Sequence, residues 1–203
     1  MFDARIRGVI DPPLNAGGRV LAGWGVSPNA VTLAGLVTGL AAAISIALGA
    51  YAVGLLLILL SRLADGLDGA IARASHPTDF GGFLDILSDF VFYGAIPFAF
   101  ALADPGANAL AAAFLLFSFY ANGSAFLAWS ILAEKRGLES SAQGVKTLYY
   151  VGGILEGAET IGLFVFFCLF PEWFAPAAWA FGAVCFVSAA ARGLLAWKVF
   201  GRT

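Results

Sequence analysis

Long apolar runs are the feature that most restricts how this chain of 203 residues can fold. A helix needs about 20 mostly apolar residues to cross the hydrocarbon core of a bilayer. Six such stretches follow one another along the chain, at roughly 30–50, 52–73, 81–103, 107–133, 147–170 and 174–198. The chain is 61% hydrophobic and 12% charged, whereas soluble domains average about 45–50% apolar and about 25% charged residues. We therefore expect an all-α polytopic membrane protein with six transmembrane helices.

Positive charges gather on one side of this arrangement. Of the eleven Lys and Arg residues, nine fall in the N-terminal segment, the turn at 73–80, the polar loop at 134–146 or the C-terminus, or at their edges. The three turns on the other side hold none. Because cytoplasmic loops of membrane proteins are enriched in Lys and Arg, the pattern predicts that both termini face the cytoplasm.

Residues 1–29 lack an apolar run long enough to span a bilayer, and they mix apolar side chains with Arg and Asp. Such a mixture is typical of an amphipathic helix that lies in the membrane interface. Because proline removes helical hydrogen bonds, we expect Pro12 and Pro13 to break this helix. The sequence thus predicts two units, a membrane-surface segment over 1–29 and a six-helix domain over 30–203.

Aspartates crowd the two predicted helices that flank a turn near Pro77. Asp65 and Asp68 are three residues apart, so they share one helix face. Asp85 and Asp89 are four residues apart and also share a face. The inner two lie nine and eight residues from Pro77, and the outer two lie twelve residues away. At about 1.5 Å per residue, the four carboxylates of an antiparallel pair reach matching depths, about 12–18 Å from the turn.

Four unpaired carboxylates at this depth would be costly. On the most lenient insertion scale a charged side chain costs at least about 2.5–3.5 kcal/mol at the centre of a membrane helix, and Arg62 and Arg73 are too few to neutralise all four. Convergent carboxylates suit hard divalent cations such as Mg²⁺ or Mn²⁺. Two ions about 3.5–4 Å apart clamp a phosphate for displacement at phosphorus. The residues therefore predict metal-assisted phosphate chemistry, although a polar seam stabilised by arginines would leave a similar pattern.

The same stretch resembles the signature of the CDP-alcohol phosphatidyltransferase family, D-x-x-D-G-x-x-A-R-x8-G-x-x-x-D-x-x-x-D. Here the two halves of the signature are written "DGLDGAIAR" and "GGFLDILSD". The matching positions are Asp65, Asp68, Gly69, Ala72, Arg73, Gly81, Asp85 and Asp89. Seven residues rather than eight precede Gly81, and the difference falls in the turn, where chain length varies readily.

The resemblance implies an enzyme that transfers a phosphatidyl group from CDP-diacylglycerol to a small alcohol, such as glycerol 3-phosphate or an inositol-type polyol, and releases CMP. It implies two Mg²⁺ or Mn²⁺ ions, which would be held by Asp65, Asp68, Asp85 and Asp89. Asp89 would also be the general base for the acceptor alcohol. The nucleotide would contact Gly69, Arg73 and Gly81.

The resemblance also bears on the surroundings of the enzyme. It implies a bacterial branch of the family, in the inner (cytoplasmic) membrane, with an active site that faces the cytoplasm. It implies a homodimer among membrane lipids, and we expect no nucleic-acid partner. Small residues four apart permit close helix packing, and two such pairs support the dimer: Gly35 with Gly39, and Gly153 with Gly157.

The acceptor alcohol has two sets of candidate contacts. Basic residues near the cytoplasmic mouth would bind an acceptor phosphate, and these are Lys135, Arg136 and Lys146. Ordinary anchoring of cytoplasmic loops explains the same residues. Two glutamates, Glu156 and Glu159, lie deep in the fifth span. They would hydrogen-bond a polyol, attract a cationic acceptor or pair with Arg192.

Two other functions would use similar residues. A divalent-cation transporter would hold its ion with intramembrane carboxylates, and an intramembrane prenyltransferase would bind a diphosphate through aspartates. The chain shows no inverted repeat and no pair of broken helices, which many transporters contain. The aspartate motifs of prenyltransferases have a different spacing, and these enzymes usually need more spans than 203 residues provide.

Overall fold

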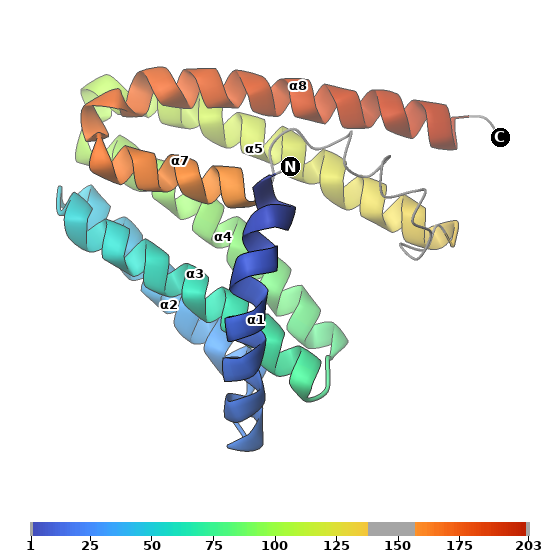
Figure 1. Cartoon of the computed structure of the whole chain (residues 1–203). Helices are drawn as coiled ribbons and strands as arrows, with labels where there is room; N and C mark the ends of the chain where they lie inside the picture. The colour runs from blue at the N-terminus through green and yellow to red at the C-terminus, as the bar shows by residue number, and fades with distance from the viewer. Residues whose placement is uncertain (1, 138–156, 202–203) are drawn as a thin grey trace.

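The structure, a computed structural model, describes residues 2–137 and 157–201. These residues form helices joined by short turns, without a strand (Figure 1). The elements are α1 (Phe2–Gly23), α2 (Pro28–Ala47), α3 (Tyr51–Ala74), α4 (Asp79–Ala103), α5 (Pro105–Lys135), α7 (Gly157–Leu169), the 3₁₀ turn η1 (Pro171–Trp173) and α8 (Phe174–Phe200). The prediction of an all-α chain is confirmed over the described residues.

Four of the predicted spans have the length and composition of a membrane helix. They correspond to α2, α4, α5 and α8 together with η1. Helix α3 has 24 residues, enough to cross a bilayer, but it carries the charges of the acidic hairpin. The described part of α7 has 13 residues, and the residues before it lie outside the described ranges. The chain is therefore an integral membrane protein, and the count of six spans stays a prediction.

A glycine makes the tight turn between the first two spans. Helix α2 ends at Ala47 and α3 begins at Tyr51, so residues 48–50 reverse the chain. The φ angle of Gly49 is +78°, in the left-handed region. Glycine reaches this region without the steric cost that a Cβ atom imposes. The reversal therefore needs neither a proline nor a long polar loop.

The helices pack in two groups that share an aromatic core. Helix α2 lies against both α3 and α4, α5 lies against α8, and α4 contacts α5 while α7 contacts α3 (Figure 1). Fully buried phenylalanines from α4, α7 and α8 meet in the middle. The rings of Phe100 and Phe174 stack with centroids 4.7 Å apart, and Phe167 contacts both. This cluster fixes α4 relative to the last two helices.

Glycines on α2 allow the close packing of the first group. A Cβ atom added to Gly35 would lie 3.1 Å from the Cβ of Ala64 on α3. A Cβ atom added to Gly39 would lie 2.6 Å from Cδ2 of Phe92 on α4. Both glycines are buried. This small-residue pair is therefore used inside the chain, and it no longer supports a contact between two copies.

Helix α1 runs steeply across the other helices and rests on α3 (Figure 1). It is continuous through Pro12 and Pro13, so the predicted break is wrong. Contacts with α3 explain the continuity: a Cβ atom at Gly18 would lie 2.6 Å from the Cβ of Ala70. Such close packing offsets the hydrogen bonds that the two prolines cannot donate. An interfacial position for α1 stays a prediction.

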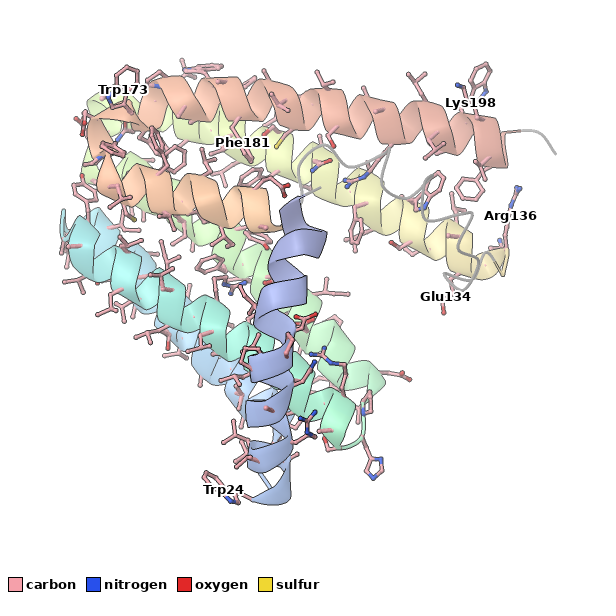
Figure 2. The ribbon with its side chains drawn as sticks, in the orientation of Figure 1. Trp24, Glu134, Arg136, Trp173, Phe181 and Lys198 are labelled. Carbon is pink, nitrogen blue, oxygen red and sulfur yellow. The ribbon has the colours of Figure 1, made fainter. Side chains whose placement is uncertain are left out.

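The connections between helices divide between two ends of the molecule. The turns α2–α3, α4–α5 and α7–α8 lie together at one end (Figure 1). Trp173 marks this end, and Glu134, Arg136 and Lys198 lie at the other (Figure 2). These three turns contain no Lys or Arg, whereas Arg136 and Lys198 lie at the other end. This distribution agrees with the predicted enrichment of positive charge on one side of the membrane.

Candidate active site

A capped turn sets the register of the acidic hairpin. Helix α3 ends at Ala74 and α4 begins at Asp79. Thr78 is the N-cap of α4, and its hydroxyl accepts a hydrogen bond from the backbone N–H of Gly81 at 3.0 Å. A capped first turn defines where a helix starts. It thereby determines which residues of α4 lie at the depth of the aspartates on α3.

The four aspartates of the signature form one electrostatic cluster. Asp65 interacts electrostatically with Asp68, Asp85 and Asp89. Asp68 is the most enclosed, with 5% of its surface exposed. The side chains of Asp65 and Asp89 are about one third exposed, at 32% and 31%. The four carboxylates that the sequence places at matching depths therefore lie close enough to interact electrostatically.

The cluster has room around it because of how α2, α3 and α4 pack. Helix α2 packs along both of its neighbours, whereas α3 and α4 make little close contact with each other. A cavity of about 180 Å³ opens beside the turn. Asp68 and Asp85 line it, together with Gly69, Gly81 and residues from the first turns of α2. The acidic side chains thus border a space that a ligand could enter.

The quartet is divided into two unequal pairs. Asp68 and Asp85 line the cavity. Arg62 contacts the other two: its Nη1 donates to Oδ1 of Asp89 at 2.7 Å and lies 3.4 Å from Oδ1 of Asp65. As these side chains stand, no group of three or more acidic, His or Cys residues in the described ranges is gathered closely enough to hold a metal ion.

The chemistry of the cluster nevertheless fits a divalent cation. Oδ2 of Asp68 is buried and has no hydrogen-bond partner within the described part of the chain. A buried carboxylate oxygen without a partner carries a desolvation cost. An ion that binds carboxylate oxygens would remove that cost, and acidic oxygen donors are what Mg²⁺ and Mn²⁺ prefer.

The three residues predicted to contact the nucleotide fall in two places. Gly69 and Gly81 line the cavity beside the aspartates. Arg73 does not: its Nη2 donates to Oδ1 of Asn15 on α1 at 2.9 Å, and it lines a second cavity of about 280 Å³ together with Arg19. Its Nη1 nevertheless lies near Gly69, 3.2 Å from where a Cβ atom of that residue would be. A nucleotide role for Arg73 stays a prediction.

One acceptor candidate has a structural partner instead. The guanidinium of Arg136 donates to the backbone oxygens of Val199 and Phe200 at 3.4 and 3.2 Å. It also lies over the ring of Phe200, 5.2 Å from its centroid. Basic side chains often satisfy the free carbonyl groups at a helix C-terminus. Arg136 therefore ties the end of α5 to the end of α8.

The remaining acceptor candidates lie at the ends of helices or outside the described residues. Lys135 is the last residue of α5, and Glu159 lies in the first turn of α7. Lys146 and Glu156 lie outside the described residues. Arg192, the expected partner of a glutamate, donates to Oδ1 of Asn122 at 2.8 Å. Acceptor roles for these residues stay predictions.

Sequence reasoning missed contributions from α2 and the role of Arg62. Asn29 and Thr32 line the cavity, and Thr32 lies next to the carboxylate of Asp68. The sequence could have indicated Asn29 and Thr32, because in a bundle of antiparallel helices α2 begins at the end where α3 ends. Arg62 precedes Asp65 by three residues, a spacing that places both on one helix face. Its longer reach to Asp89 on α4 depends on the packing of the two helices.

Comparisons with known proteins agree on one family. The family model of CDP-alcohol phosphatidyltransferases matches residues 25–190. The inner membrane protein YnjF of Escherichia coli is 49% identical over 192 residues, which cover 95% of this chain and 93% of that protein. Archaetidylinositol phosphate synthase of Pyrococcus horikoshii is 34% identical over 100 residues, which cover 49% of this chain and 53% of that enzyme.

Solved structures share the fold. Phosphatidylinositol phosphate synthase (PgsA1) of Mycobacterium tuberculosis with CDP-DAG bound superposes with a TM-score of 0.71 at 20% identity, over 91% of this chain and 93% of that one. The same protein in complex with manganese and citrate also gives a TM-score of 0.71. The family model spans most of the chain, the acidic signature included. The chain therefore belongs to the CDP-alcohol phosphatidyltransferase family.

Proposed function

We propose that this protein transfers a phosphatidyl group from CDP-diacylglycerol to a small alcohol and releases CMP, with Mg²⁺ or Mn²⁺ ions as cofactors. The observation that carries the proposal is the cluster of four carboxylates between α3 and α4, beside a cavity at the turn of the hairpin. PgsA1, which shares the fold, has been solved with CDP-DAG and with manganese. Both facts support a CDP-linked lipid donor and a divalent ion.

The carboxylates have separate tasks in this proposal. Asp65, Asp68, Asp85 and Asp89 hold two ions. When bound, these ions supply positive charge that stabilises the charge developing on the phosphate oxygens. Gly69 and Gly81 add no side chain of their own to the wall of the cavity, so that the nucleotide can approach the backbone at these two positions.

Asp89 acts as the general base. Its carboxylate takes the proton of the acceptor hydroxyl. The hydroxyl oxygen then forms a bond to the lipid-bearing phosphorus, and the bond from that phosphorus to the oxygen of CMP breaks. CMP leaves with the electron pair of the broken bond. The products are a phospholipid and CMP.

The proposed surroundings follow from the helices and from YnjF, which is named an inner membrane protein. We place the chain in the inner (cytoplasmic) membrane with six spans, with residues 1–29 on the membrane surface and 30–203 as the catalytic domain. Both termini and the open side of the cavity face the cytoplasm. The described polar end of the molecule, with Arg136 and Lys198, suits the cytoplasmic side (Figure 2).

The acceptor is proposed to be a phosphorylated polyol. Two relatives carry names that specify inositol phosphate lipids as products. Lys135, Lys146, Glu156 and Glu159 remain the candidate contacts, through charge to the phosphate or hydrogen bonds to hydroxyls.

The test is synthesis of a new lipid by the purified protein. Labelled CDP-diacylglycerol and Mn²⁺ are supplied with inositol phosphate, inositol or glycerol 3-phosphate, and CMP and the lipid product are measured. We expect CMP and product in equal amounts with one acceptor, and neither after chelation of the metal. The absence of CMP release with every acceptor, combined with Mn²⁺ uptake into proteoliposomes, would favour a cation transporter instead.

A further inference from the structure

Arg62 occupies an unusual place in the acidic cluster. Its side chain is 15% exposed, in the middle of α3, and it reaches across to α4. Its Nη1 donates to Asp89 at 2.7 Å and lies 3.4 Å from Oδ1 of Asp65, while its Nη2 donates to Oγ of Ser61 at 3.3 Å. A guanidinium pairs well with carboxylates because its N–H groups diverge in one plane. Arg62 thus places a positive charge beside Asp65 and Asp89, the two aspartates that lie farther from the α3–α4 turn.

The surrounding packing holds this charge in position. The guanidinium carbon of Arg62 lies 4.0 Å from the centroid of the Phe92 ring. Arginine is attracted to the face of an aromatic ring, most strongly where water is excluded. Phe92 is itself fully buried, and it contacts Gly39 of α2 so closely that no side chain fits there. Three helices therefore fix the guanidinium beside the carboxylate of Asp89.

The two halves of the quartet consequently differ in direct contact with Arg62, which acts on Asp85 only through longer-range electrostatics. The half that lines the cavity contains Asp68 and Asp85, and a buried oxygen of Asp68 lacks a partner. The half that contacts Arg62 contains Asp65 and Asp89, whose charges are partly balanced. A divalent ion is attracted by the first half and repelled by the guanidinium in the second.

We propose that Arg62 is a positioning residue of the metal site: its guanidinium holds the carboxylate of Asp89 and weakens the binding of a divalent ion to the Asp65–Asp89 half. This inference rests on the proposed function, because it assumes that the quartet binds divalent ions. Asp68 and Asp85 are then the ligands of the firmly held ion. The ion that uses Asp89 binds weakly until the negative charge of a donor pyrophosphate offsets the charge of Arg62.

Direct measurement of Mn²⁺ binding tests the inference. Electron paramagnetic resonance of free Mn²⁺ gives the affinity of the purified full-length protein without donor or acceptor. For Arg62→Met, which removes the charge and keeps most of the volume, we expect Mn²⁺ to bind at least about tenfold more tightly, because a neighbouring cation has been removed. A purely structural role predicts unchanged or weaker binding in this variant. Either of those results in folded protein would overturn the inference.

Two other variants serve as controls. Arg62→Lys keeps the charge, so its Mn²⁺ affinity should stay near the wild-type value, while its turnover falls because an ammonium lacks the forked geometry. Arg192→Met removes another partly buried arginine, which lies 5.5 Å from the centroid of the Phe126 ring. It should leave Mn²⁺ affinity unchanged. A tenfold increase in affinity for Arg192→Met would show that the effect of Arg62 is not local.

A paired replacement covers the case in which Arg62→Met does not fold. Removing one partner of a buried ion pair is often more harmful than removing both. The Mn²⁺ affinity of Asp89→Asn is therefore compared with that of Asp89→Asn combined with Arg62→Met. We expect tighter binding in the double variant, and equal or weaker binding would refute the inference. If the wild-type protein binds no Mn²⁺ at all, the proposed metal-dependent function itself fails.

Discussion

Asp89 is the residue at which the proposed chemistry and the local electrostatics meet. Its carboxylate accepts a short hydrogen bond from Arg62 and is about one third exposed, at 31%. A base must remain accessible to its substrate while its orientation is fixed. Both conditions are satisfied here, because one oxygen is held at 2.7 Å and the side chain is not enclosed. Individual substitutions can distinguish a role of Asp89 as the general base from a role only as the ion-pair partner of Arg62.

For Asp89→Asn we expect turnover to fall by about 10²–10⁴-fold, the usual contribution of a general base. Binding of CDP-diacylglycerol should be largely retained, because the amide has nearly the same shape. Single-turnover CMP release and equilibrium binding of the donor measure the two quantities. Asp104→Asn is the control: Asp104 caps α5 at the opposite end of the hairpin, where it accepts from Ala107 at 3.0 Å. Near-normal turnover of Asp89→Asn would rule out Asp89 as the base.

For Asp68→Asn we expect a loss of metal binding. The substitution removes a negative charge from the most enclosed carboxylate and places a neutral amide where an oxygen lacks a partner. The affinity for Mn²⁺ should fall by more than the roughly tenfold minimum that loss of an outer-shell partner costs. Titration of Mn²⁺ measures the change, with the exposed Glu172→Gln as a control. Unchanged affinity in Asp68→Asn would place the metal elsewhere.

At the scale of elements, α2 is the scaffold of the site. It packs on both α3 and α4, whose backbones make little close contact with each other. The contact between Gly39 and Phe92 connects this packing to the chemistry, because Phe92 lies against the guanidinium of Arg62. Helix α2 carries none of the four aspartates. A substitution at Gly39 on α2 should nevertheless shift the ring of Phe92, and with it the guanidinium of Arg62.

The substitution Gly39→Ala tests this connection. Its Cβ atom would lie 2.6 Å from Cδ2 of Phe92, so the buried ring must shift. Overpacking of this kind typically costs about 1–3 kcal/mol, and turnover should fall as Arg62 moves. Gly94→Ala on α4 is the matched control, because nothing lies within 4 Å of the added atom. Denaturation in mixed micelles gives the free energy of unfolding, and equal values for the two variants would contradict the packing argument.

Across the whole molecule, the two ends of the helix bundle carry different side chains. This difference fits one orientation of the protein in the membrane. Three helix turns share one end, and Glu134, Arg136 and Lys198 lie at the other (Figures 1 and 2). The α3–α4 turn, which borders the cavity, does not lie at the end that holds the other three turns. The proposed topology requires this turn to lie at the cytoplasmic side, with the cavity beside it.

Cysteine labelling tests the orientation. A membrane-impermeant maleimide should label Glu134→Cys from the cytoplasmic side and Glu172→Cys from the opposite side, because these exposed residues lie at opposite ends of the helices. The native Cys168 and Cys185 are buried, so the unmodified protein should give little background. Labelling of both introduced cysteines from the same side would contradict the proposed topology.

The homodimer is the remaining prediction at this scale. The buried Gly35 and Gly39 are used within the chain, and Gly153 of the other pair lies outside the described residues. The prediction therefore rests on the family resemblance. Crosslinking or single-molecule counting in native membranes should show two copies. The contact must then use a surface other than these two glycines, and Gly39→Ala should leave the number of copies unchanged. A monomer in native membranes would exclude the dimer.

Properties that depend on neighbours along the chain could be predicted from the amino-acid sequence alone. Runs of apolar residues located the helices of the acidic hairpin to within two residues, from 52–73 and 81–103 to Tyr51–Ala74 and Asp79–Ala103. The spacing of aspartates placed each pair on one helix face, and their distances from Pro77 indicated a common depth. Helical periodicity is a local property, so these features needed no knowledge of packing.

Which groups meet across helices depends on how the helices pack. The pairing of Arg62 with Asp89, the contact of Gly39 with Phe92, and the continuity of α1 through its prolines each depend on the distance between two helices. Hydropathy and periodicity say which face of a helix is apolar, but they do not say which partner it meets or how closely. Which of the four carboxylates contact Arg62 is therefore decided by the packing of the helices.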